Sequence, residues 1–198
     1  MDCKKKKMKV RKNNMLNFEK PMGYDEVQAG GEFTPIELGG HKLIIKKIEE
    51  VQASNGSTYL KVSFDTAQDD KQPNYYSEQW KKDTRDNKKW GGVANIFPID
   101  IHGKTSKTFK QFCTSIERSN NSQIQWGTGF ENSIVNKVVG GIFGEEEYYN
   151  SIGEVKTARK LFYWASVDNV SEAKIPNKRE VEKIDDDITP VDDGDMPF

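Results

Sequence analysis

The alternation of side chains from Tyr59 to Thr66 constrains the fold of this chain more than any other feature. The apolar members of the alternating set are Leu60, Val62 and Phe64. Strict alternation with a period of two predicts a β-strand that buries one face. Asn55-Gly56 lies just ahead and supplies the positive φ angles of a tight turn. The apolar-rich segment 41–52 is therefore predicted to be the partner strand of a hairpin.

Further along the chain, four more segments have the pattern of a regular element. Three of them are β-rich and are predicted to be strands: 93–99, 136–149 and 154–167. Asn150–Gly153 is the predicted turn between the last two. In the fourth, Phe109, Phe112, Cys113 and Ile116 recur at spacings of three, one and three, which predicts a helix over 106–119.

The predicted order of elements is β-β-β-α-β-β, which is the chain order of an OB-fold. We therefore expect an all-β domain with one helix, a five-stranded Greek-key barrel. A small α+β sheet has the same order and stays an alternative. The polar stretch 69–87 is predicted to be irregular, or briefly helical around 76–82, and 120–132 is predicted to be a loop.

Two opposite blocks of charge flank a neutral body. Residues 1–12 hold seven Lys or Arg and one Asp, a net charge of +6, and residues 180–198 hold eight Asp or Glu and one Lys, a net charge of −7. We expect a basic disordered extension over residues 1–16, a folded domain over residues 17–171 and a disordered acidic tail over residues 172–198. The basic block is an interaction arm or merely a solubilising end, and Met15 is a candidate start of the native chain.

The sequence argues against several classes of protein. It has no apolar run near 18 residues and no apolar segment after its basic start, so neither a membrane span nor a secretory signal is expected. With only two cysteines, Cys3 and Cys113, no disulfide framework is expected, and a reducing cytoplasm is predicted. His41 and His102 have no partner at metal-ligand spacing, and no catalytic motif is present, so we expect no enzyme, cofactor or metal. Glu145–Glu147 alternate between strand faces and are predicted to be a solvated strand end.

Aromatic and basic side chains are interleaved in three places. Single-stranded nucleic acid needs this mixture, because cations neutralise phosphates and flat rings stack on unpaired bases. The candidate binding residues are Tyr59, Lys61, Trp80, Lys81, Lys82, Arg85, Lys88, Lys89, Trp90, Lys156, Arg159 and Lys160. Any one of the rings has core packing as its alternative role. The loop with Trp80 and Trp90 is the strongest candidate, since five cations lie in the same stretch.

The C-terminus carries the most specific signal. Its last residues place aspartates before an apolar residue, a proline and a terminal ring: Asp192, Asp193, Asp195, Met196, Pro197 and Phe198. A basic-rimmed apolar pocket on another protein can capture the ring, the α-carboxylate and the flanking charge together. We therefore expect the tail to bind partner proteins.

These residues resemble known families. Asp-Gly-Asp-Met-Pro-Phe resembles the acidic terminus of bacterial single-stranded DNA-binding proteins, with Met where that consensus has Ile or Leu. The body resembles the single-stranded DNA-binding proteins of phages of Gram-positive bacteria. The matching stretches are 17–24, 109–120, 138–148, 153–155 and 164–167. The basic start before Met15 departs from the pattern.

The resemblance implies an OB-fold, sequence-independent binding of single-stranded DNA in phage replication or recombination, and a tail that recruits replication and recombination proteins. A homo-oligomer is one option for its assembly. Two other functions stay open from the residues: an OB module that binds RNA or a protein, and a magnesium-dependent nuclease that uses Glu145–Glu147, Asp65 and Asp69.

Overall fold

The computed structural model describes residues 19–25 and 34–181. The chain divides into two units, residues 1–34 and 35–198. In the first unit, the described residues form a turn in which Tyr24 N donates to the Pro21 carbonyl at 3.2 Å. All the helices and strands described belong to the second unit. Within the described ranges, no helix combines the length and the apolar character needed to cross a membrane.

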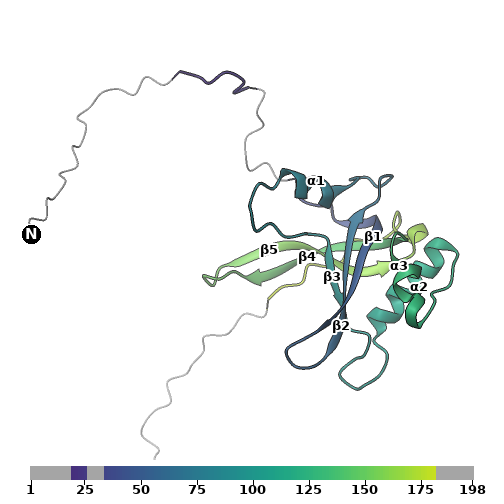
Figure 1. Cartoon of the computed structure of the whole chain (residues 1–198). Coiled ribbons are helices and arrows are strands. Elements are labelled where there is room, and N and C mark those ends of the chain that lie inside the picture. The colour runs from purple at the N-terminus through teal and green to yellow at the C-terminus, as the bar shows by residue number, and fades with distance from the viewer. Residues whose placement is uncertain (1–18, 26–33, 182–198) are drawn as a thin grey trace, which may run out of the picture. The chain divides into compact units, whose positions relative to one another are not determined.

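The second unit is built on one antiparallel sheet of five strands (Figure 1). The strands are β1 (Gly39–Gln52), β2 (Thr58–Thr66), β3 (Val93–Ile96), β4 (Val138–Tyr149) and β5 (Val155–Ala165). The helices are α1 (Tyr75–Lys82), α2 (Lys107–Asn120) and α3 (Phe130–Ile134), with 3₁₀ turns at Gly127–Gly129 and Val167–Asn169. The strand order is β3-β2-β1-β4-β5, so β3 and β5 are the two edges. The expectation of a predominantly β fold is confirmed, whereas the sheet is not closed into a barrel.

The brief helix considered around 76–82 is present as α1, whereas the expectation of a single helix is wrong for α3, which was not predicted. Residues 130–134 lie within and just beyond the stretch predicted to be a loop, and their five-residue helix is too short to show a clear apolar period. Helix α2 agrees with the sequence. The Ser106 side chain accepts from Phe109 N at 3.5 Å, and Asn121 ends the helix with a positive φ of 46°.

Aromatic rings dominate the core between the sheet and α2. The Trp164 ring lies 4.8 Å from that of Phe112 on α2 and 5.8 Å from that of Phe64 on β2, measured between centroids. All three side chains are buried. Burying a side chain of this size contributes roughly 1.5–3 kcal/mol, so this contact between helix and sheet is a major source of stability.

A buried carboxylate holds α1 against β2. Asp65 is fully buried and accepts hydrogen bonds from the backbone N–H groups of Tyr76 at 2.8 Å and Ser77 at 3.2 Å, and from the Ser77 hydroxyl. Asn74, the residue before α1, makes no side-chain cap of its own. The first-turn N–H groups of α1 are therefore satisfied by a residue of another element, which is why local sequence signals for this helix are weak.

The packed chain continues past Ser171, the predicted end of the domain. Arg179 N donates to the Glu145 carbonyl at 2.9 Å, and Glu147 N donates to the Arg179 carbonyl at 2.8 Å. These bonds form a parallel bridge to β4 beyond the last residue that β4 pairs with β1. The segment 172–181, which the sequence assigns to the tail, thus contributes backbone pairing to the sheet.

Replacing Asp65 with alanine should lower the free energy of unfolding by about 2–4 kcal/mol, because three donors around α1 lose their acceptor in a buried place. Urea denaturation measures the effect. Asp69→Ala is the matched control, since that carboxylate is 67% exposed and is ion-paired only with Lys42, and it should change stability by less than about 0.5 kcal/mol. Equal losses in the two variants would contradict this role of Asp65.

Candidate nucleic-acid interface

The outward side of β1, β2 and β3 forms three rows of side chains across the sheet. We call it the outer face, and its members are Lys47, Glu49, Val51, Tyr59, Lys61, Ser63, Val93, Asn95 and Phe97. The register pairs Tyr59 with Val51, and it pairs Lys61 with both Glu49 and Asn95. On the inward side, Val62 and Phe64 are buried. The alternation in the sequence thus places Tyr59 and Lys61 on one face, as predicted.

An aromatic pair lies at one end of the outer face. The rings of Tyr59 and Phe97 are 5.4 Å apart between centroids, and Phe97 is 45% exposed although it is a large apolar side chain. Sequence reasoning did not select Phe97 as a binding residue. Its position, two residues after Asn95 in the alternation of β3, is the signal that identifies it.

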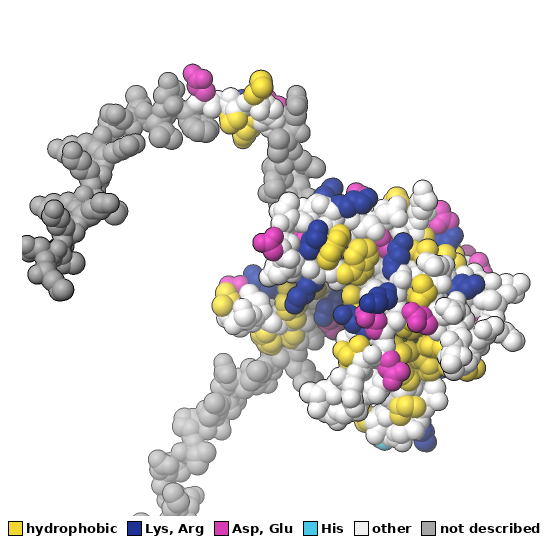
Figure 2. Space-filling view, viewed as in Figure 1, with side chains coloured by type: hydrophobic (Ala, Val, Ile, Leu, Met, Phe, Trp, Pro, Cys, Tyr) yellow, Lys and Arg dark blue, Asp and Glu magenta, His cyan; other side chains and the backbone are white. Residues whose placement is uncertain are grey.

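A second aromatic pair lies between α1 and the start of β3. Trp80 on α1 and Trp90 have ring centroids 6.0 Å apart, and Trp80 is exposed. The Lys88 ammonium lies 4.7 Å from the Trp80 ring centroid and donates to the carbonyls of Trp80 and Asp83. Figure 2 shows lysine and arginine side chains around hydrophobic ones on the face that carries α1 and β3.

The two tryptophans differ in their attachment. Trp90 is half-buried, packs against the core and donates its indole N–H to the Phe64 carbonyl at 3.0 Å. Gly92 makes this approach possible, because a Cβ there would lie 2.1 Å from the Phe64 oxygen. Trp90 is therefore in part a structural ring, the alternative role considered above, whereas Trp80 offers an open face.

The cations of this region fall into two groups. Lys81 is ion-paired with Glu78 at 2.7 Å, and Arg85 with Asp83 at 2.7 Å. Hydrogen bonds from Arg85 lower the pKa of Asp83 to about 2. Lys82 and Lys89 are exposed, and within the described part of the chain neither forms an ion pair. The charges free to meet a phosphate are therefore mainly those of these two lysines and of Lys61.

The predicted cations of β5 are all paired with carboxylates, so they do not add free charges to this region. Lys156 pairs with Glu154 at 2.9 Å, and Lys160 with Glu146 at 2.5 Å. Arg159 lies on the other side of the strand, where it donates to the Ile36 carbonyl at 2.7 Å and pairs with Glu145 at 3.5 Å. Each of these charges is already compensated, which weakens their assignment as DNA contacts.

The carboxylates and histidines of the candidate lists are dispersed. Glu147 pairs with Lys178, and Asp69 with Lys42. Across 19–25 and 34–181, no group of three His, Cys, Asp or Glu side chains is arranged so that it could hold a metal ion. His41 is buried and contacts Asp70 at 2.8 Å. Burial raises the pKa of Asp70, but hydrogen bonds from His41, Gln72 and Lys42 outweigh it and hold that pKa below its usual value. The six predicted tail residues, 192–198, lie outside the described residues.

The different attachment of the two tryptophans predicts different costs. Trp90→Ala should lower the free energy of unfolding by about 3 kcal/mol, because a packed ring and its hydrogen bond are lost, whereas Trp80→Ala should cost less than about 1 kcal/mol. Thermal and urea unfolding of both variants provide the measurement. A larger loss for Trp80 would mean that the two rings have been assigned in reverse.

Comparisons with known proteins do not place the chain in a family. No protein-family model matches it. No curated protein matches it either. The resemblance to phage single-stranded DNA-binding proteins therefore rests on the matching stretches quoted above.

Proposed function

We propose that this protein binds single-stranded DNA without sequence preference, on an OB-type barrel. The strand order supports the barrel. In an OB-fold, β1 pairs with β2 and β4, β3 continues from β2, and β5 continues from β4. The order β3-β2-β1-β4-β5 has these same neighbours. A helix, α2, separates β3 from β4, as in the β-β-β-α-β-β chain order of an OB-fold. OB barrels are often partly open, and the opening here lies between β3 and β5.

The observation that carries the proposal is the chemistry of the outer face and its surroundings. OB-folds bind oligonucleotides across strands 2 and 3, and here that surface holds the Tyr59–Phe97 pair and Lys61. Trp80 adds an exposed ring next to Lys82 and other cations. Each base that stacks on a ring contributes roughly 1–3 kcal/mol to the binding free energy, and cations neutralise the phosphates of the DNA backbone. Stacking tolerates any base, so the protein reads no sequence.

Coating is the physical basis of the activity. A strand whose bases stack on the protein cannot re-anneal, and its backbone is less accessible to nucleases. In this proposal the acidic tail then holds replication and recombination enzymes next to the coated strand, in the cytoplasm of a bacterial host.

A nuclease is less consistent with the geometry. Its candidate carboxylates are engaged separately: Asp65 binds the start of α1, and Glu145, Glu146 and Glu147 meet basic side chains along the β4–β5 hairpin and the segment after it. An RNA- or protein-binding OB module is the second candidate function, and oligo-U against oligo-dT competition separates RNA from DNA.

Titration with oligo-dT should quench the tryptophan fluorescence, with affinity that falls as salt rises. On single strands each phosphate contact should contribute roughly 0.7 to the log–log salt slope. Labelled DNA incubated with magnesium should stay intact. Unchanged fluorescence together with no gel shift at low salt would overturn the proposed function, and cleavage would favour the nuclease.

Deletion of 192–198 should abolish capture of replication or recombination enzymes while leaving DNA affinity equal or slightly higher. The net charge of −7 over 180–198 repels phosphate, most visibly at low salt. Phe198→Ala should weaken capture nearly as much without changing any charge, and it is the control for electrostatics. Reduced DNA affinity with intact partner capture would show that the role assigned to the tail is wrong.

A further inference from the structure

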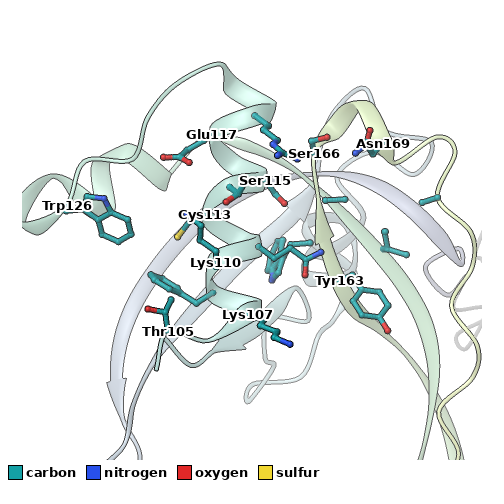
Figure 3. Close-up of a pocket in the computed structure, with 18 residues that line it drawn as sticks. Thr105, Lys107, Lys110, Cys113, Ser115, Glu117, Trp126, Tyr163, Ser166 and Asn169 are labelled. Atoms are coloured by element: carbon teal, nitrogen blue, oxygen red, sulfur yellow. The ribbon is translucent and has the colours of Figure 1, made fainter. Parts of the chain in front are cut away.

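A groove of about 1250 Å³ extends over α2, with β5 on one side of the helix and the segment that carries Trp126 on the other, and it is not part of the outer face. Lys107, Lys110 and Arg118 line it from the helix, and Tyr163 lines it from the strand. Figure 3 shows Tyr163 on the strand to one side of α2 and Trp126 on the segment to its other side, with Lys107 and Lys110 on the helix between them. None of these side chains is among the candidate binding residues chosen from the sequence.

The rings of the groove are held in place and still exposed. Trp126 is 66% exposed, yet it stacks on Phe130 with centroids 5.5 Å apart and an interplanar angle of 22°. Phe109 supports it from α2 at 6.2 Å. Tyr163 is 46% exposed. A ring fixed on one side and open on the other is a stacking platform, because little side-chain entropy is lost when a base covers it.

The charges of the groove are uncompensated, in contrast to those of the β4–β5 hairpin. Within the described part of the chain, Lys107, Lys110 and Arg118 form no ion pair. The single carboxylate of the lining, Glu117, accepts from Ile124 N at 3.1 Å. The groove thus has a net charge of +2, which suits a polyanion. Burial raises the pKa of the Cys113 thiol to about 11, so the groove presents no thiolate nucleophile.

The backbone connects this groove with the outer face. Ser106, at the start of α2, donates its N–H to the Pro98 carbonyl at 2.8 Å. Pro98 directly follows Phe97, whose ring pairs with Tyr59. The helix end that carries Thr105 and Lys107 therefore lies next to the aromatic end of the outer face. Asp100 is the one acidic residue of the connecting loop, 98–106. A DNA strand that continues from Phe97 into the groove therefore meets little negative charge on this loop.

From these contacts we propose that the groove over α2 is a second binding segment for the same DNA strand, in which bases stack on Trp126 and Tyr163 on either side of the helix and phosphates meet Lys107 and Lys110. This inference rests on the proposed function and extends it, because it makes the occupied length of DNA longer than the outer face alone can hold. Continuity with the outer face favours a nucleic acid over an acidic peptide as the occupant.

The test compares oligo-dT of about 6 nucleotides, near the lower end of the usual 4–16 nucleotides per OB-fold, with oligo-dT of about 20, which exceeds the upper end. The full-length chain is measured with Trp126→Ala and with Lys107→Gln/Lys110→Gln. Lys71→Gln/Lys137→Gln is the control of equal charge, since neither lysine lines the groove. The groove variants should bind the long oligonucleotide about tenfold more weakly and occlude fewer nucleotides, while the short one binds as before.

Each alternative result has a definite meaning. Unchanged long-oligonucleotide binding in both groove variants overturns the inference and leaves the proposed function intact. Equal weakening of short and long oligonucleotides, with unchanged thermal unfolding, also overturns it, because the groove is then no separate segment. If the wild type binds neither length, the proposed function itself fails. A synthetic peptide of residues 192–198 provides the last comparison. If it binds the wild type but not the groove variants, and these variants still bind DNA, the groove is a peptide site and the inference is overturned.

Discussion

The Asp65 carboxylate is the interaction on which the candidate interface depends. It lies in the sheet but satisfies the N-terminal N–H groups of α1, so it ties a polar, otherwise irregular stretch to β2. Once α1 is fixed, Trp80 on its last turn lies beside Trp90, which is itself bonded to the neighbouring Phe64 carbonyl. Asp65 therefore positions the helix that carries Trp80, against a second ring that β2 holds through its own hydrogen bond.

The distribution of ion pairs separates structural cations from available ones. Along β5 and the segment after Ser171, Lys160, Arg159 and Arg179 face Glu145 and Glu146, and these charges stabilise the hairpin locally. Lys82, Lys89 and the α2 lysines meet no such partner within the described residues. A polyanion binds most favourably to cations that need not give up an existing ion pair. The number of unpaired lysines and arginines therefore matters more for DNA binding than the total number along the sequence.

The sequence predicts the strands and α2 well, because alternation, the Asn55-Gly56 turn and a helix cap are local signals. The common face of Tyr59 and Lys61 follows from the alternation, and the extent of α2 follows from its apolar spacing and its cap. It offers α1 only as a brief helical option, because the acceptor for its first-turn N–H groups is Asp65 of another element. It does not predict the pairing of Arg159, which depends on Glu145 and Ile36. For the same reason, the candidate binding residues chosen from the sequence do not include Phe97, Trp126 or Tyr163. A ring is recognised as a platform only when its exposure and its supporting contacts are known.

In the proposed function, single-stranded DNA lies across the outer face of β2 and β3 and on Trp80. An NMR titration of the ¹⁵N-labelled protein with oligo-dT tests it most directly. We expect the largest shifts at the indole N–H of Trp80 and the amides of Lys61, Asn95 and Phe97, with the buried Trp164 indole nearly unchanged. Saturable binding with these signals unmoved and shifts confined to other surfaces would contradict the account.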